Sequence, residues 1–249
     1  MSFLQFLIFK QNVVILHKII CVGLLIYCYN YDIIIIESVE RMKIMLNSVI
    51  TISRQYGSGG RFVAKKLAEK LGVPYYDNEL ITMAAKESGY AENVFEKAEQ
   101  MSSHSFLYSV SMFGTAAGVY GLPLSDKVFL IQSDIIKKCA ESGPCVIVGR
   151  CADYVLRERA NVINFFLYSD LDSKIQRYKK YYNDENKSDK DIKDEILKRD
   201  KKRCAYYNYY TTQRWGDVEN YHLAINTDAV GIDGCVDIME KFILHHETI

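Results

Sequence analysis

Residues 49–71 constrain the fold more than any other stretch, because they predict a buried strand, a glycine-rich turn and an amphipathic helix in succession. The first part is rich in β-branched apolar residues, which favour a strand inside a parallel sheet. The turn contains three glycines, Gly57, Gly59 and Gly60, which let backbone N–H groups come close to an anion. The free amides of the following helix would point at the same anion. The stretch therefore predicts a phosphate-binding loop, and a plain tight turn is the alternative.

This loop keeps only part of the phosphate-loop pattern G-x-x-x-x-G-K-[ST]. With Gly59 as the second glycine, Arg54 stands in the place of the first glycine, Gly60 in that of the lysine and Arg61 in that of the Ser/Thr. The dinucleotide pattern G-x-G-x-x-G is also incomplete, because Phe62 occupies its third glycine. The sequence thus predicts the backbone half of a phosphate site and leaves open which residue supplies the positive charge.

Composition limits the classes of partner. The chain has 249 residues with 31 Lys+Arg and 31 Asp+Glu, so no global charge favours nucleic acid or an anionic membrane. Its seven cysteines are odd in number and contain no C-x-x-C pair, so they indicate neither a disulfide framework nor a zinc site. We therefore expect a cytoplasmic protein with small-molecule partners and no nucleic acid.

Residues 1–46 differ from the rest, because apolar runs dominate them. One interpretation is a membrane helix over residues 19–36, although Asp32 would lie inside it. A second is that translation starts at Met42 or Met45, and a third is an extra packed element. We expect residues 47–249 to form the functional domain and a membrane partner only if residues 1–36 are an anchor.

From residue 49 onward, predicted strands and helices alternate, which indicates an α/β fold with a mostly parallel sheet and helices on both faces. Two predicted strands end in charged residues, Asp77 and Arg150. Open α/β sheets bind ligands at the carboxyl ends of their strands, so both side chains are candidate ligand-binding groups. The alternatives are that Asp77 caps the next helix and that Arg150 pairs with Asp153 or Glu158.

A basic segment follows the fourth predicted strand. Residues 174–203 hold twelve Lys/Arg and seven Asp/Glu, a local net charge of +5 in a neutral chain. On a helix, Arg199 and Arg203 are four residues apart and share a face, so together they could bind one polyphosphate. A solvated charged helix is the alternative.

Five blocks in order resemble the cytidylate kinase-like family of phosphate-loop proteins. They are residues 50–61 (ITISRQYGSGGR), 73–77 (VPYYD), 146–153 (VIVGRCAD), 199–210 (RDKKRCAYYNYY) and 215–227 (WGDVENYHLAINT). The resemblance implies a nucleoside monophosphate kinase fold with a five-stranded parallel sheet, a nucleotide-binding insertion at about 78–125 and a basic lid at about 183–210. It also implies phosphoryl transfer from ATP to CMP or dCMP with Mg²⁺, while the residues that would hold the metal stay unknown.

The resemblance also implies roles for single residues. Gly57, Ser58, Gly59, Gly60 and Arg61 would bind the ATP phosphates, and the catalytic group would comprise Arg150, Arg199 and Arg203. The acceptor site would comprise Asp77, Arg150, Lys174 and Arg177.

The sequence leaves three functional classes. The first is a kinase of nucleoside monophosphates or a related small acceptor. The second is a nucleotide-binding regulator of the same fold that lost turnover with the loop lysine. The third is a dehydrogenase-like dinucleotide binder, which the basic lid disfavours.

Overall fold

The computed structural model describes residues 46–95, 123–182 and 187–248. The possible membrane helix at residues 19–36 lies outside them, as do most of the expected insertion and the start of the expected lid. Within the three described ranges, no helix combines the length and apolar character that crossing a bilayer requires. All elements below belong to the unit Asn47–Ile249.

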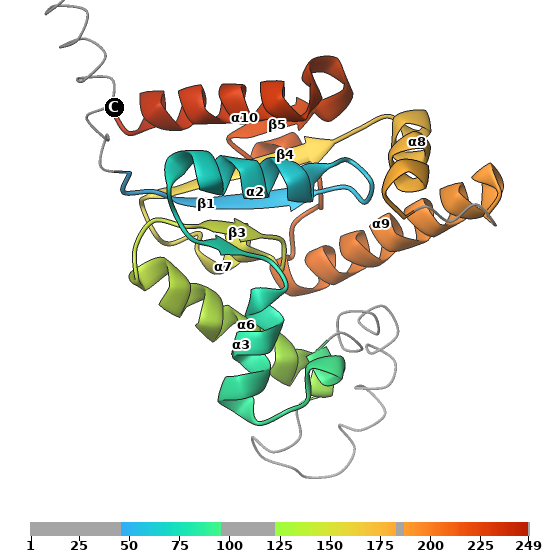
Figure 1. Cartoon of the computed structure of the whole chain (residues 1–249). Coiled ribbons are helices and arrows are strands. Elements are labelled where there is room, and N and C mark those ends of the chain that lie inside the picture. Colours follow the sequence, from blue (N-terminus) through green and yellow to red (C-terminus); the bar gives the residue numbers. More distant parts are fainter. Residues whose placement is uncertain (1–45, 96–122, 183–186, 249) are drawn as a thin grey trace, which may run out of the picture. The chain divides into compact units, whose positions relative to one another are not determined.

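The five strands form one sheet in the order β2-β3-β1-β4-β5, and every neighbouring pair is parallel. This confirms the predicted fold class. Figure 1 shows the sheet at the centre of the unit with helices on both sides. The strands are β1 (Val49–Arg54), β2 (Tyr75–Tyr76), β3 (Val146–Val148), β4 (Val162–Tyr168) and β5 (Leu223–Asn226).

The central strands are buried because both faces of the sheet are covered. In β1 five of the six residues are buried, and Ile52 is paired with Val148 on one side and with Phe165 on the other. Strands covered on both faces favour apolar residues at successive positions, as in β3 (VIV), and in β1 the buried Thr51 and Ser53 are the polar exceptions. The register aligns the carboxyl ends of β1, β2 and β3 at one edge.

Helices α2 and α10 pack together on one side of the sheet, and α3, α6 and α7 lie on the other (Figure 1). Ion pairs such as Lys66–Asp233 at 2.5 Å link the outer surfaces of α2 and α10. On the opposite face, buried side chains of α3 and α6 pack on Ile147 of β3. The bounds are α2 (Gly60–Leu71), α3 (Glu79–Ser88), α6 (Leu124–Glu141), α7 (Ala152–Val155) and α10 (Thr227–His246).

Helices α8 (Leu171–Tyr182) and α9 (Asp189–Thr211) contact each other near the carboxyl end of β1. Ser188 and Asp191 form a capping box that fixes the start of α9. Tyr56, from the loop after β1, is buried with Ile175 of α8 and Ile192 of α9. This small core ties the basic helices to the glycine-rich loop.

Two elements have other bounds than their sequence predicts. The pattern of residues 72–77 predicts the second strand, but the strand is only Tyr75–Tyr76, at the sheet edge, where it pairs with β3 alone. The pattern of residues 231–245 predicts the last helix, but this helix begins at Thr227. Gly231 adopts φ 71° and ψ 176° and kinks the helix, while Asn226 caps its start by accepting the Asp228 N–H.

Candidate active site

The loop between β1 and α2 has the backbone of an anion-binding turn. Gly57 and Gly59 have φ of 78° and 81°, in the left-handed region that favours glycine. The buried Ser58 fixes the turn: its hydroxyl donates to Gln55 O at 2.8 Å and accepts the Gly60 N–H at 3.3 Å. Behind it, the Thr227 hydroxyl donates to Ser58 O at 2.7 Å. The loop is therefore held from the start of α10 as well as by the side chain of Ser58.

The structure explains why glycine replaces the usual lysine at position 60. A Cβ atom built on Gly60 would lie 2.7 Å from Cβ of Arg54, which is closer than two non-bonded carbon atoms come in proteins. The clash is with the stem of the residue that stands in the place of the pattern's first glycine. The two departures from the phosphate-loop pattern are therefore physically coupled.

Arg54 crosses the edge of the sheet and is buried there. Its guanidinium lies over the backbone of Gly149, where a Cβ atom would clash with it, and its Nη2 is 3.4 Å from Oδ1 of Asp77. Burial, together with the nearby Arg203, lowers the pKa of Arg54, and Asp77 partly offsets this. A guanidinium remains charged at neutral pH, so this side chain brings a partly desolvated positive charge to the site.

The carboxylate of Asp77 forms ion pairs with three arginines. Its carboxylate lies 2.5 Å from Nε of Arg61, 3.4 Å from Nη2 of Arg54 and 3.7 Å from Nη1 of Arg150. Arg150 also donates to the backbone oxygen of Asp77 at 2.7 Å. The side chain of Asp77 is 4% exposed, so these contacts are made largely out of solvent. One negative charge among three positive ones leaves this cluster electropositive.

The turn after β3 is strained where it delivers Arg150. Arg150 and Cys151 have φ of 53° and 55°, two consecutive non-glycine residues in the left-handed region. Each such residue costs roughly 1–3 kcal/mol, and such strain concentrates at functional sites. Here the strained turn brings the arginine side chain, 8% exposed, against Asp77. Arg150 does not pair with Asp153, whose carboxylate instead accepts from the Tyr207 hydroxyl at 2.7 Å.

These side chains border a pocket of about 310 Å³ at the carboxyl edge of the sheet. Among the described residues, its wall combines six basic side chains with one carboxylate. An aromatic side is supplied by Tyr206, Tyr207 and Trp215. The wall is formed by Ser53, Arg54, Arg61, Asp77, Asn78, Ile81, Arg150, Cys151, Arg199, Lys202, Arg203, Tyr206, Tyr207 and Trp215.

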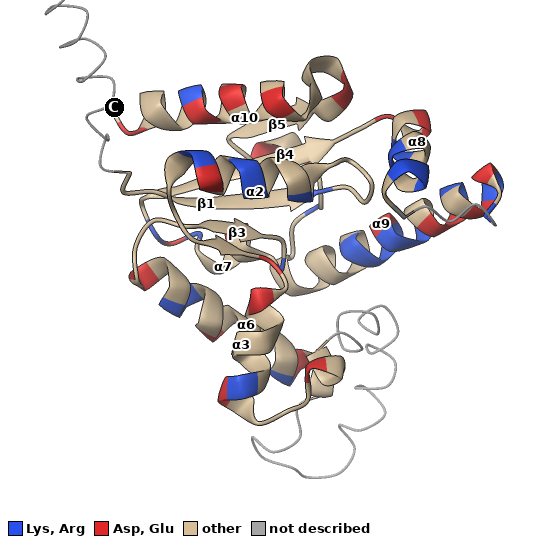
Figure 2. Ribbon diagram, in the orientation of Figure 1, with Lys and Arg blue, Asp and Glu red and all other residues tan. Residues whose placement is uncertain are grey.

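Helix α9 brings its arginines to this pocket, and Figure 2 shows basic residues gathered along its middle. Arg203 donates to Arg54 O at 3.0 Å, and burial lowers its pKa. Arg199 is 53% exposed, lies 4.5 Å from the ring centre of Tyr56 and pairs with Glu195 at 2.8 Å. The two arginines expected to act together thus share the pocket but differ in burial.

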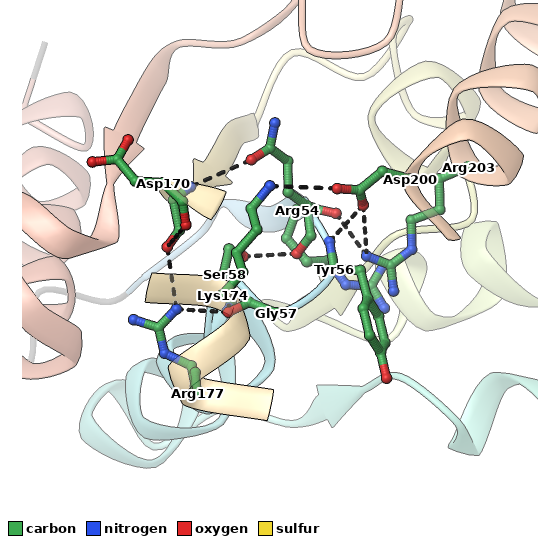
Figure 3. Close-up of polar contacts among 12 residues, drawn as sticks. Arg54, Tyr56, Gly57, Ser58, Asp170, Lys174, Arg177, Asp200 and Arg203 are labelled. Atoms are coloured by element: carbon green, nitrogen blue, oxygen red, sulfur yellow. Dashed lines mark hydrogen bonds and ion pairs between the residues drawn. The ribbon is translucent and has the colours of Figure 1, made fainter. Parts of the chain in front are cut away.

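Lys174 and Arg177 lie elsewhere. Both come from α8 and contact the phosphate loop instead of the wall of the pocket, as Figure 3 shows. Arg177 donates to Gly57 O at 2.6 Å and pairs with Asp228 at 3.3 Å. Lys174 pairs with Asp200 at 3.5 Å. The resemblance implies that Lys174 and Arg177 join Asp77 in the acceptor site. The structure instead keeps both side chains out of the pocket wall that contains Asp77.

The structure thus joins Asp77 and Arg150 with Arg61, Arg199 and Arg203 in one pocket beside the loop. Sequence reasoning missed the Asp153–Tyr207 pair, in which burial raises the pKa of Asp153. It identified Arg54 in the place of the pattern's first glycine, but it did not predict the contact of this side chain with Asp77.

A five-stranded parallel sheet with a glycine loop and basic helices at its carboxyl edge defines a phosphate-loop kinase-like fold. A model of the cytidylate kinase-like family matches residues 49–229, and the chain belongs to this family. No curated protein matches the chain.

Several solved structures are similar to this chain. An uncharacterized protein from Eubacterium ventriosum is 28% identical, with a TM-score of 0.58 over 79% of this chain and 98% of that one. Shikimate kinase from Bacteroides thetaiotaomicron is 16% identical, with a TM-score of 0.46 over 79% and 98%. A gluconokinase from Sinorhizobium meliloti is 12% identical, with a TM-score of 0.42 over 80% and 95%.

Proposed function

We propose that this chain is an ATP-dependent phosphotransferase whose acceptor is itself phosphorylated, a nucleoside monophosphate such as CMP or dCMP. The observation that carries the proposal is the pocket with six basic side chains and one carboxylate among its described residues, next to the glycine loop. Transfer between two phosphates brings like charges together, and positive charge fixed in place lowers the cost. A neutral acceptor would not require such an excess.

The donor's phosphates would bind at the loop and the first turn of α2, where backbone N–H groups and the helix dipole favour anions. In the described ranges, no group of three or more His, Cys, Asp or Glu side chains could hold a metal ion by itself. Mg²⁺ commonly binds through substrate phosphates and waters, so it would enter with ATP and neutralise charge on the donor phosphates.

The acceptor's phosphate would bind to Arg150, Arg54 and Arg61 around Asp77. This moves Arg61, which the resemblance assigns to the ATP phosphates, to the acceptor, because its Nε lies at the Asp77 carboxylate. A phosphate oxygen is ionised at neutral pH and needs no base to become a nucleophile. A sugar or shikimate hydroxyl does need one. Asp77, the carboxylate of the pocket, has its oxygens engaged by arginines and is badly placed to accept a proton. This favours a monophosphate over a hydroxyl acceptor.

Arg203 and Arg199 would neutralise the transferring group. The transition state of phosphoryl transfer spreads negative charge over the equatorial oxygens, and converging arginines stabilise it. Both side chains line the pocket, from α9. The aromatic residues of the wall would face the rest of the acceptor, where a base can stack.

A coupled ADP-release assay on the full chain tests the proposal with ATP·Mg²⁺ and a panel of AMP, GMP, UMP, CMP, dCMP and shikimate. We expect release that depends on a pyrimidine monophosphate and is absent with shikimate. ADP release with shikimate but with none of the nucleoside monophosphates would refute the proposal that the acceptor is itself phosphorylated.

A regulatory nucleotide binder of the same fold is the second candidate, and the glycine at position 60 favours it. Calorimetric titration with ATP separates the two candidates. ATP binding without ADP release on any acceptor of the panel would support the regulator.

A further inference from the structure

The phosphate loop carries no lysine of its own, and position 60 has no room for one beside Arg54. Yet a basic side chain does reach the loop from outside. Lys174 of α8 lies so close to Gly57 that a Cβ atom there would be 3.1 Å from Cβ of Lys174. The approach leaves little room for a side chain at Gly57, whose positive φ already favours glycine.

A carboxylate of the protein itself accepts a hydrogen bond from the backbone of the loop. Oδ1 of Asp200, on α9, accepts the Tyr56 N–H at 2.6 Å, and Nη1 of Arg203 lies 3.9 Å from it. Oδ2 of the same carboxylate lies 3.5 Å from Nζ of Lys174. Figure 3 shows the backbone amide, the ammonium and the guanidinium converging on this one carboxylate. Amide and cation donors together are the set with which proteins bind phosphate oxygens.

The ion pair between Lys174 and Asp200 is largely shielded from solvent. The side chains of Lys174 and Asp200 are 8% and 14% exposed, and burial raises the pKa of Asp200 despite its donors. Within the described part of the chain, this carboxylate is the one acidic group paired with Lys174. A phosphate has more charge and more acceptor oxygens than a carboxylate, so it can take over the same donors with stronger interactions.

We propose that Lys174 is the cation that contacts the nucleotide's phosphates at this loop, in place of a loop lysine, and that Asp200 holds it until phosphate displaces the carboxylate. The inference rests on the proposed function. It moves Lys174 from the acceptor site to the donor site. It also means that Asp200 competes with the donor's phosphates for Lys174. Asp200 lies on α9, the helix that bears Arg199 and Arg203.

Inorganic tripolyphosphate is the test ligand, because it offers the donor's phosphates without base or acceptor. Calorimetric titrations would use the full chain at fixed ionic strength, with CMP as the second ligand. We expect Lys174→Met to weaken tripolyphosphate binding about tenfold or more, as for a lost charge-assisted hydrogen bond, and to change CMP binding less than about twofold. Lys70→Met is the matched control, because Lys70 pairs with Asp237 at 2.7 Å on the exposed surface.

Equal tripolyphosphate affinity in Lys174→Met and the wild type would overturn the inference and leave the proposed function standing. A wild type that binds neither tripolyphosphate nor ATP would instead overturn the proposed function.

Asp200→Asn provides a second test, which also decides the matter if Lys174→Met does not fold. Removing the charge of the competing carboxylate should tighten tripolyphosphate binding about threefold or more. Unchanged or weaker binding would show that Asp200 does not compete with phosphate, and would overturn the inference.

Discussion

Two carboxylates at the edge of the sheet are surrounded by cations, and they differ in what supports them. Asp77 follows an edge strand and is held by three arginines, two of which come from the ends of neighbouring strands. Asp200 belongs to a helix that reaches the loop through a single backbone N–H and a few side chains. The first cluster is therefore part of the sheet's own scaffold. In the inference above, a phosphate displaces the second carboxylate without any change in the sheet.

This difference assigns the two sites to the two substrates of the proposed reaction. In the proposed reaction, the cluster at Asp77 would be the acceptor site, with more positive charge than its carboxylate balances. The cluster at Asp200 would belong to the donor site, where Asp200 itself is the anion. Mutations should therefore separate acceptor binding, donor binding and turnover.

The largest effect is expected for Arg203→Ala. Arg203 is mostly buried between the loop and the pocket, and an arginine that acts in the transition state contributes on the order of 10³-fold to kcat. Steady-state kinetics at saturating ATP and CMP should show that loss in kcat, together with a smaller loss of ATP affinity, because Arg203 also lies 3.9 Å from Asp200 in the donor cluster. Arg199→Ala should lower kcat as well, but less, because that side chain is 53% exposed.

Arg157→Ala is a matched control, since Arg157 pairs with Glu158 on the surface and should leave kcat unchanged. Wild-type kcat in both Arg203→Ala and Arg199→Ala would contradict the role of the two α9 arginines in the transition state.

Arg150→Ala should come next. We expect KM for the acceptor to rise about 10²-fold, because a charge-assisted, bidentate-capable contact is lost, while tripolyphosphate binding stays near wild type. The measurement is KM for CMP beside a calorimetric titration with tripolyphosphate. Equal losses for the two ligands would break the division into acceptor and donor sites.

Restoring the lysine of the phosphate-loop pattern should harm the protein. In Gly60→Lys the new Cβ meets Cβ of Arg54, and overpacking of this kind costs about 1–3 kcal/mol of unfolding free energy. Arg54→Gly removes that Cβ, so the double variant should be more stable than the sum of the single changes predicts. Urea unfolding of the four proteins measures the coupling. Additive effects would show that the two departures from the pattern are independent.

The smallest effect concerns pH. Burial raises the pKa of Asp200, so on acidification it takes up a proton earlier than an exposed aspartate and then stops competing with phosphate. The advantage of Asp200→Asn over wild type in tripolyphosphate affinity should therefore shrink as pH falls from about 7.5 to about 5. Comparing the two proteins at each pH cancels the titration of the ligand. A constant advantage across this range would contradict the role of the Asp200 charge.

Much of the fold followed from local sequence signals. The strand, loop and helix of residues 49–71 were recognisable because apolar periodicity and glycines are local features. Asp77 and Arg150 could be placed together because parallel strands align their carboxyl ends at one edge.

The side-chain contacts did not follow from the sequence. The contact between Asp200 and the Tyr56 N–H joins residues 144 apart and depends on how α9 docks. Similarly, the rotation of α8 about its own axis decides whether Lys174 and Arg177 face the loop or the pocket. Helical spacing fixes which residues share a face, but not what that face meets.

The central claim is that this site moves a phosphoryl group from ATP to a phosphorylated acceptor. The most direct measurement incubates the full chain with γ-labelled ATP, Mg²⁺ and CMP and separates the products. We predict that the label appears in CDP and that Arg203→Ala abolishes most of this transfer. Label that remains in ATP or appears only as inorganic phosphate, with each monophosphate of the panel in turn, would contradict the account.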